Sequence, residues 1–288
     1  MAAKGFWKRH ENLYFAISNK KVIFGVVVFL AIVALALFGP LVTPYGYDDF
    51  AGPGYRPPSR EHWFGTTIMG RDVFTQVVYG LRSTLLVGFL AGTIASAIGL
   101  VVGFVSGFFS GRAPDEGLMM LTNMFMVLPS LAILIILSAY LPYRGIVTQS
   151  LIVAATAWPW TARAVRSQTL SLKSQEFVNL SRISAAPTLR IIREDIAANM
   201  FSYVFMVYIL QFNGTILSSV GLEFLGLGPT RGISLGLVLQ NAVNWNALHL
   251  GMWWWTIIPG LILTMLIVSL YFINTGLDEV FNPRLREM

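Results

Sequence analysis

The sequence predicts an all-α integral membrane protein with about six transmembrane helices, and its composition and its apolar stretches lead to this prediction. Apolar residues make up 55% of the 288-residue chain and charged residues only 12%, whereas soluble domains carry about 25% charged residues. Several apolar stretches also reach the length of about 20 residues that a membrane-spanning helix needs. Backbone groups without partners are too costly in hydrocarbon, so these stretches must be helical.

Six stretches are expected to span the membrane, in an order that leaves short connections between most of them. They are Val22–Val42, Thr84–Phe109, Leu118–Leu141, Gly145–Ala164, Phe201–Leu222 and Trp253–Leu277. The fourth is the weakest because Gln149, Thr156 and Pro159 interrupt it. In the second, small residues recur near one face, which favours close approach of another helix. They are Gly88, Gly92, Ser96, Gly99, Gly103, Gly107 and Gly111.

A charged segment in the second half of the chain must lie in water. Nine ionisable side chains fall within residues 163–199, and at the bilayer centre they would cost on the order of 25 kcal/mol. They are Arg163, Arg166, Lys173, Glu176, Arg182, Arg190, Arg193, Glu194 and Asp195. The segment is therefore predicted to be a structured loop between two spans.

The distribution of Lys and Arg predicts the orientation. With six spans and a cytoplasmic N-terminus, 14 of the 20 Lys and Arg residues fall on the cytoplasmic side, as the positive-inside rule requires. Both termini and the charged loop are then cytoplasmic, and the net charge of +6 needs no nucleic-acid partner.

The chain is expected to form one membrane domain with four parts. Residues 1–21 form a cytoplasmic or interfacial N-terminal segment, and residues 22–83 hold the first span and an external loop. Residues 84–277 form a five-helix core that contains the charged loop at 165–199, and residues 278–288 form a cytoplasmic tail. The external loop is predicted to be extended because of its prolines, which are Pro40, Pro44, Pro53, Pro57 and Pro58.

The charged loop is predicted to contain two short amphipathic helices. Ser174 is suited to cap the first, with Glu176 in its first turn, where a negative charge favours the helix dipole. Pro187 is suited to be the first residue of the second helix, and Leu189, Ile192 and Ile196 would form its apolar stripe. Such a compact pair of helices either docks into a groove of a cytoplasmic partner or rests on the lipid headgroups.

Two groups of residues outside the charged loop each have two possible roles. Five lie in the fifth span, where polar groups hydrogen-bond to another helix or line a translocation path; they are Gln211, Asn213, Thr215, Ser218 and Ser219. Gly70, Arg71 and Asp72 precede the second span and either fix the start of that helix or face an external partner. The chain has no cysteine, no histidine pair with metal-ligand spacing and no phosphate-binding loop.

Several ordered motifs carry a family resemblance over nearly the whole chain. They are Phe38–Tyr45, His62–Thr66 with Gly70–Val73, Tyr79–Leu85, Glu223–Gly228, Trp254 through Pro259-Gly260, and Gly276–Asp278 with Asn282–Arg284. Together they resemble the second of the two permease types in the dipeptide/oligopeptide/nickel family of ABC importers. The charged loop departs from the family pattern at three places. Asn179-Leu180-Ser181 replaces an acidic residue and two alanines, and Ala185 replaces a glycine. Ala197-Ala198-Asn199 stands where the family has Leu-Pro-Asn.

The resemblance implies a type I ABC importer (MetI-like) permease fold in a prokaryotic inner membrane. It implies four kinds of partner: a second homologous permease, two cytoplasmic ATPase subunits, an extracytoplasmic solute-binding protein and the lipid bilayer. ATP and Mg would be bound by the ATPases, so this chain would be non-catalytic and bind no cofactor. The residues implied to couple it to the ATPases are Glu176, Phe177, Leu180, Ser181, Arg182, Ala185, Arg190 and Ile192.

The cargo and the energy source remain open between alternatives. Residues 229–234 depart from the sequence that many peptide-type members have after Leu227-Gly228, so an oligopeptide and an oligosaccharide are both retained as cargo. A secondary transporter driven by an ion gradient and a non-transporting membrane scaffold are the rival classes. The secondary transporter is disfavoured because no Asp or Glu occupies the centre of any expected span.

Overall fold

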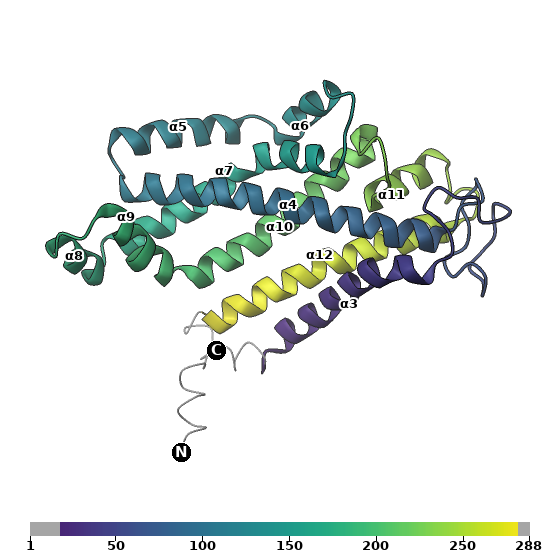
Figure 1. Cartoon of the computed structure of the whole chain (residues 1–288), viewed down its shortest axis with the longest axis horizontal. Helices are drawn as coiled ribbons and strands as arrows, with labels where there is room; N and C mark the ends of the chain where they lie inside the picture. The colour runs from purple at the N-terminus through teal and green to yellow at the C-terminus, as the bar shows by residue number, and fades with distance from the viewer. Residues whose placement is uncertain (1–17, 282–288) are drawn as a thin grey trace, which may run out of the picture. The chain divides into compact units, whose positions relative to one another are not determined.

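A computed structural model describes residues 18–281, which are mostly helical apart from a long loop at residues 43–72 (Figure 1). Within this range no strand forms, and Thr66 and Asp72 make an isolated β-bridge. The described chain divides into two compact units. The first holds the chain up to Val87, residues 143–146 and the chain from Ser219, and the second holds Gly88–Pro142 and Val147–Ser218. The all-α prediction is confirmed.

The first unit contains the first and last helices of the described chain, which lie side by side (Figure 1). Its elements are α3 (Lys20–Val42), the start of α4 (Val73–Phe108), the π-helix η2 (Glu223–Leu227), α11 (Leu235–Asn244) and α12 (Trp253–Phe281). Gly25 lets α3 approach α12 closely, because a Cβ there would lie 2.6 Å from the carbonyl oxygen of Ser269.

The second unit contains the remainder of α4 and most of α10 together with the charged segment. Helix α10 spans Phe201–Leu222, and the other elements are α5 (Ala113–Val127), α6 (Ser130–Ala139), α7 (Ile146–Lys173), α8 (Glu176–Ile183), α9 (Thr188–Arg190) and the π-helix η1 (Ile191–Ala197). The bounds of α10 match those predicted for the fifth span.

Small residues of α4 pack against two different helices, as their spacing predicts. A Cβ added at Gly99, Gly103 or Gly107 would lie 2.5–2.7 Å from side-chain atoms of α7. Gly88 faces α10 instead, where a Cβ would lie 2.4 Å from Ile216. One face of a single helix therefore holds both α7 and α10, and larger side chains would separate them.

One expected helix start and the place of one proline are corrected. Helix α4 begins at Val73 and not near Thr84, so the predicted division at residues 83 and 84 falls inside a helix. Pro40 was expected in the extended external loop but lies within α3, whose end at Val42 is the predicted end of the first span; the proline removes the one main-chain hydrogen bond that its own nitrogen would donate, to the carbonyl of residue 36. The expected N-terminal segment 1–21 and the motif at 282–284 lie almost wholly outside the described residues.

The third expected span is broken into two helices. Helices α5 and α6 meet at an angle of 83° across Leu128 and Pro129. The residue before a proline avoids the helical conformation because the proline ring collides with its backbone, and Leu128 is extended, with φ −75° and ψ 133°. Pro129 thus ends the helix in the middle of the apolar stretch.

The described helices include fewer apolar spans than the six predicted. Four are long and apolar enough to cross a membrane, and a fifth is counted if α5 and α6 form one broken span. Helix α7 is absent from this group although its 28 residues extend about 42 Å. Its polar residues lower its mean hydropathy, and for the same reason the fourth stretch is the weakest of the six expected spans.

Candidate functional site

The charged segment folds as a pair of short helices, here called the two-helix segment (residues 174–199), anchored by a small buried core. The core residues are Val165, Val178, Ile191, Ile196 and Met200. Ile191 and Ile196 are five residues apart and both buried, because a π-helix aligns residues i and i+5. The predicted stripe of Leu189, Ile192 and Ile196 is therefore wrong: Leu189 is 76% exposed, and Ile192 is half-buried.

The opposite surface of the two-helix segment presents large apolar side chains without cover. Leu180 is 64% exposed and Ile183 is 82% exposed, while Phe177 is 38% exposed. Val178, between them, is fully buried. Each short helix thus has an inner side that fixes it to α7 and an outer side that displays hydrocarbon, and displayed apolar patches mark interaction sites.

The helix starts in this segment differ from the prediction. Ser174 does not cap α8; its hydroxyl donates to the carbonyl of Ser171 at 3.1 Å, because α7 continues to Lys173. Gln175 occupies the N-cap position without a side-chain hydrogen bond. Pro187 is the N-cap of α9 and not its first residue.

The turn between the two helices uses a left-handed alanine. Ala185 has φ +55°, a conformation that residues other than glycine rarely adopt. The amide of Ala185 donates to the carbonyl of Arg182 at 3.0 Å, and that of Ala186 donates to the carbonyl of Ser181 at 3.1 Å. This pair of bonds is the Schellman motif that closes a helix. The chain therefore turns between the two short helices at Ala185, where the resembled family has glycine.

Charged residues of the segment are arranged in two groups. The guanidinium of Arg182 lies 5.5 Å from the centre of the Phe108 ring, and the ammonium of Lys173 lies 6.0 Å from it. Burial lowers the pKa of Lys173, and repulsion by nearby arginines lowers it further. On the second helix Arg190 pairs with Glu194 at 2.9 Å, which lowers the pKa of that carboxyl. Glu176 remains exposed in the first turn of α8.

Most of the polar residues singled out in α10 make hydrogen bonds within the fold. Gln211 accepts from the hydroxyl of Thr161 at 2.8 Å, and Thr215 donates to the carbonyl of Gly88 at 3.1 Å. These bonds join α10 to α7 and to α4. Ser218 donates to the carbonyl of Gly214 at 2.9 Å in its own helix. Interhelical bonding thus accounts for Gln211 and Thr215, and Asn213 is half-buried.

A buried carboxylate that the sequence analysis did not single out lies at the start of α11. Glu223 is fully buried and accepts hydrogen bonds from the hydroxyls of Ser219 at 2.9 Å and Ser234 at 2.7 Å. Ser234 is the N-cap of α11, so the negative charge lies where the helix dipole favours it. A Cβ at Gly236 would lie 2.3 Å from the carboxylate. The motif at 223–228 contains Glu223, but no sequence pattern shows its partners.

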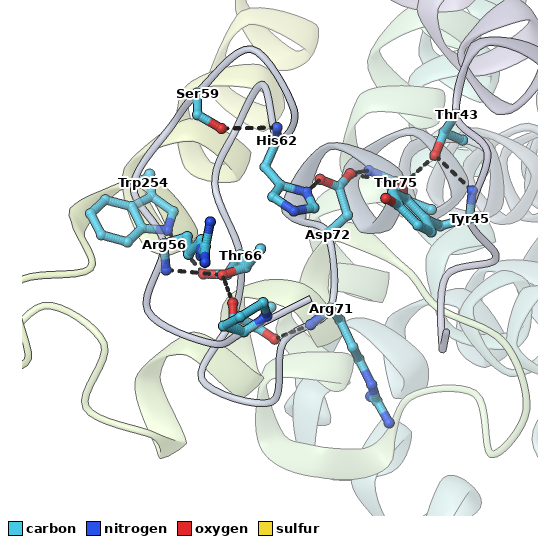
Figure 2. A network of polar contacts seen from close by, with 12 residues as sticks. Thr43, Tyr45, Arg56, Ser59, His62, Thr66, Arg71, Asp72, Thr75 and Trp254 are labelled. Atoms are coloured by element: carbon cyan, nitrogen blue, oxygen red, sulfur yellow. Dashed lines mark hydrogen bonds and ion pairs between the residues drawn. The ribbon is translucent and has the colours of Figure 1, made fainter. Parts of the chain in front are cut away.

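The proline-rich loop (residues 43–72) ends in a network that fixes the start of α4 (Figure 2). Asp72 accepts from both the amide and the hydroxyl of Thr75 at 2.8 Å, and its other oxygen lies 2.9 Å from Nδ1 of His62. Asp72 and His62 are both buried. Arg71 pairs with Asp48 at 2.7 Å, and Gly70 has φ +73°. Asp72 therefore caps the helix, one of the two roles expected for it.

The same loop is tied to α12 through an aromatic side chain. Nε1 of Trp254 donates to the carbonyl of Thr66 at 3.1 Å (Figure 2). Gly65 lies against this indole, since a Cβ there would be 2.7 Å from Nε1. The motifs that the sequence analysis found at residues 62–73 and at Trp254 thus meet in one structural network.

Comparisons with known proteins agree with this geometry. A family model described as "Binding-protein-dependent transport system inner membrane component" matches residues 99–287, and one for the N-terminal TM domain of oligopeptide transport permease C matches residues 17–58. The dipeptide transport system permease protein DppC of Bacillus subtilis is 32% identical over 97% of this chain and 85% of its own length. The oligopeptide transport system permease protein OppC of the same organism is 30% identical over 94% and 88%.

A solved structure supports the fold. The MetNI methionine ABC transporter in an inward-facing conformation matches with a TM-score of 0.57 over 71% of this chain and 94% of that chain, at 17% identity. The helices therefore form the permease fold of a type I ABC importer. This chain belongs to the family of binding-protein-dependent transport system inner membrane components.

Proposed function

We propose that this chain is one permease subunit of an ATP-driven peptide importer in a prokaryotic inner membrane. A second, homologous permease would complete the translocation path, and an extracytoplasmic binding protein would deliver the cargo. Two cytoplasmic ATPase subunits would supply the energy, and both termini would be cytoplasmic. The family membership and the relatives named as peptide permeases support this proposal.

Peptide cargo is preferred to oligosaccharide on the basis of the relatives. The dipeptide permease, the oligopeptide permease and a putative peptide permease of Brucella suis each match more than 90% of this chain at 30–32% identity. All three names specify peptides. The different residues at 229–234 do not favour a sugar by themselves.

The two-helix segment is proposed to be the surface that the ATPases grip. The observation that carries this proposal is the pairing of an anchored inner side with an exposed apolar outer side. Val178, Ile191 and Ile196 fix the segment to the fold, while Leu180 and Ile183 stay exposed. A partner that covered this exposed apolar surface would be bound more tightly, because burying apolar surface is favourable by roughly 25 cal/mol per Å². A rigid attachment is needed for the partner's movement to reach α7.

Truncation of the outer side tests the docking role. The double variant Phe177→Ala, Leu180→Ala removes exposed apolar contacts and leaves the buried core intact. We expect normal membrane insertion and loss of most of the ATPase that co-purifies with the complete importer, because interface anchors dominate binding energy. The measurement is the ATPase-to-permease ratio after affinity purification.

A matched double variant on the proline-rich loop controls for the loss of exposed hydrocarbon. Phe50 is 74% exposed and Met69 is 46% exposed, so Phe50→Ala, Met69→Ala is expected to leave the ATPase-to-permease ratio unchanged. Undiminished ATPase recovery with the Phe177 and Leu180 variant would instead favour a helical hairpin that rests on lipid headgroups.

A further inference from the structure

Helix α5 carries a methionine-rich groove, defined by Glu116, Met120, Asn123, Met124 and Val127. The hollow along this helix has a volume of about 860 Å³ and is also lined by Met119 and Leu128. The hollow is open on one side, and the residues that line it lie on α5 and at its C-cap. Methionine side chains are flexible and polarisable, so they adapt to ligands of different shape.

Both kinds of charge are available at the groove. Among the described residues, Glu116 has no ion-pair partner, and Nη2 of Arg163 on α7 donates to Oδ1 of Asn123 at 2.7 Å without pairing to a carboxylate. The neighbouring Asp115 and Arg166 contrast with them, because these two bind each other at 2.7 and 2.8 Å. One carboxylate and one guanidinium are thus free to bind a ligand.

Lipid is a poor occupant for this groove. Glu116 and Arg163 are both exposed and lie at the ends of the expected third and fourth spans, so Asn123 is the polar position of the groove that falls inside a span. Asn123 lies seven residues beyond Glu116, about 10 Å further along the helix, so the polar positions continue well past the first turn of α5. A water-filled passage satisfies these groups, and acyl chains do not.

The spacing of Glu116 and Asn123 along α5 fits a short zwitterion. The rise of about 10 Å from Glu116 to Asn123, to which Arg163 donates, corresponds to about three residues of extended peptide. A peptide in this orientation would place its amino group near Glu116 and its carboxylate near Arg163. Its side chains would lie against Met120 and Met124.

We propose that the methionine-rich groove of α5 is a binding surface for short, zwitterionic peptides in transit. This inference rests on the proposed peptide-importer function and adds a location and a recognition chemistry to it. The methionines accept many side chains, while Glu116 and Arg163 select the two free termini. All residues that these two roles need are present in the described chain.

Thiol labelling tests whether the groove is wet and whether peptide fills it. The chain has no cysteine, so Met120→Cys introduces its only thiol, and labelling is scored on this chain after separation from its partners. The complete importer is trapped with ATP, vanadate and binding protein, with or without a tripeptide. We expect reaction with a water-soluble maleimide and at least a several-fold slower reaction when the tripeptide is present.

Val101→Cys is the matched control, because Val101 is 65% exposed on α4 among apolar neighbours and is expected to stay unreactive. If Met120→Cys is equally unreactive, lipid or another subunit covers the groove and the inference is wrong. Reaction that the tripeptide does not slow also contradicts it. In either case, intact ATP-dependent uptake by the unaltered importer would leave the proposed function standing.

Charge variants test the recognition chemistry separately. Glu116→Gln is expected to lower tripeptide uptake by about two- to five-fold, the effect of one exposed ion pair, and Glu116→Asp is expected to restore most of it. Arg163→Gln and Arg163→Lys should behave in the same way. Unchanged uptake with both glutamine variants would show that these charges do not select the peptide termini.

Discussion

Ala185 shows how a single residue limits the two-helix segment. A left-handed conformation costs an L-residue about 1–2 kcal/mol, and Ala185 adopts it with φ +55° because the hydrogen bonds of Ala185 and Ala186 close α8. Alanine stands here where the resembled family has glycine. The strain is thus local and removable.

Ala185→Gly is predicted to stabilise this turn by about 1 kcal/mol, because glycine adopts the left-handed conformation without the Cβ penalty. The amide of Ala186, which donates to Ser181, should then exchange with solvent deuterium about five-fold more slowly. Hydrogen exchange followed by mass spectrometry measures this rate.

Ala186→Gly is the control for this prediction. Ala186 does not have a positive φ, so glycine there adds only unfolded-state entropy and should speed exchange. Equal effects at the two positions would contradict the assignment of strain to Ala185.

At the scale of helices, α4 is the element that organises the second unit. Its glycines accept α7 and α10 on one face, and this contact was predictable because small residues at helical spacing have a direct steric meaning. The break at Pro129 could also have been predicted, since proline restricts the residue before it. The π-helix η1 could not have been predicted, because the five-residue spacing of the buried Ile191 and Ile196 does not match the i+3 and i+4 spacing of an α-helix.

Gly103→Ala is predicted to destabilise the packing of α4 against α7 by about 1–3 kcal/mol. The new Cβ would lie 2.7 Å from Cβ of Val165 and 2.8 Å from the carbonyl oxygen of Ala162, and neither atom can move without shifting α7. The measurement is the midpoint of thermal unfolding of the purified protein in detergent.

Gly214→Ala in α10 is the matched control, because nothing lies within 4 Å of a Cβ at that position. Alanine is favoured over glycine in a helix by roughly 0.5–1 kcal/mol, so this variant should be neutral or more stable. A similar loss of stability in both variants would mean that steric contact with α7 is not the cause.

For the whole molecule, the membrane class and helical fold followed from composition, because long apolar stretches have few alternatives in a bilayer. The cap that Asp72 forms with Thr75 was among the roles expected, but the contact of Asp72 with His62 and the burial of Glu223 could not be predicted, since these depend on folding and not on sequence spacing. The orientation and the partner subunits are still predictions. They are proposals about an assembly in which this chain supplies a path and a docking surface but no nucleotide site of the familiar type.

The central claim is that transport through this chain is driven by ATP hydrolysis on separate subunits gripping the two-helix segment. Uptake of a labelled tripeptide into proteoliposomes that contain both permeases and both ATPases, with binding protein outside, tests it most directly. We predict accumulation only when ATP is enclosed in the vesicles, and inhibition of this accumulation by vanadate. Accumulation by this chain alone under a proton or sodium gradient, insensitive to vanadate, would contradict the claim.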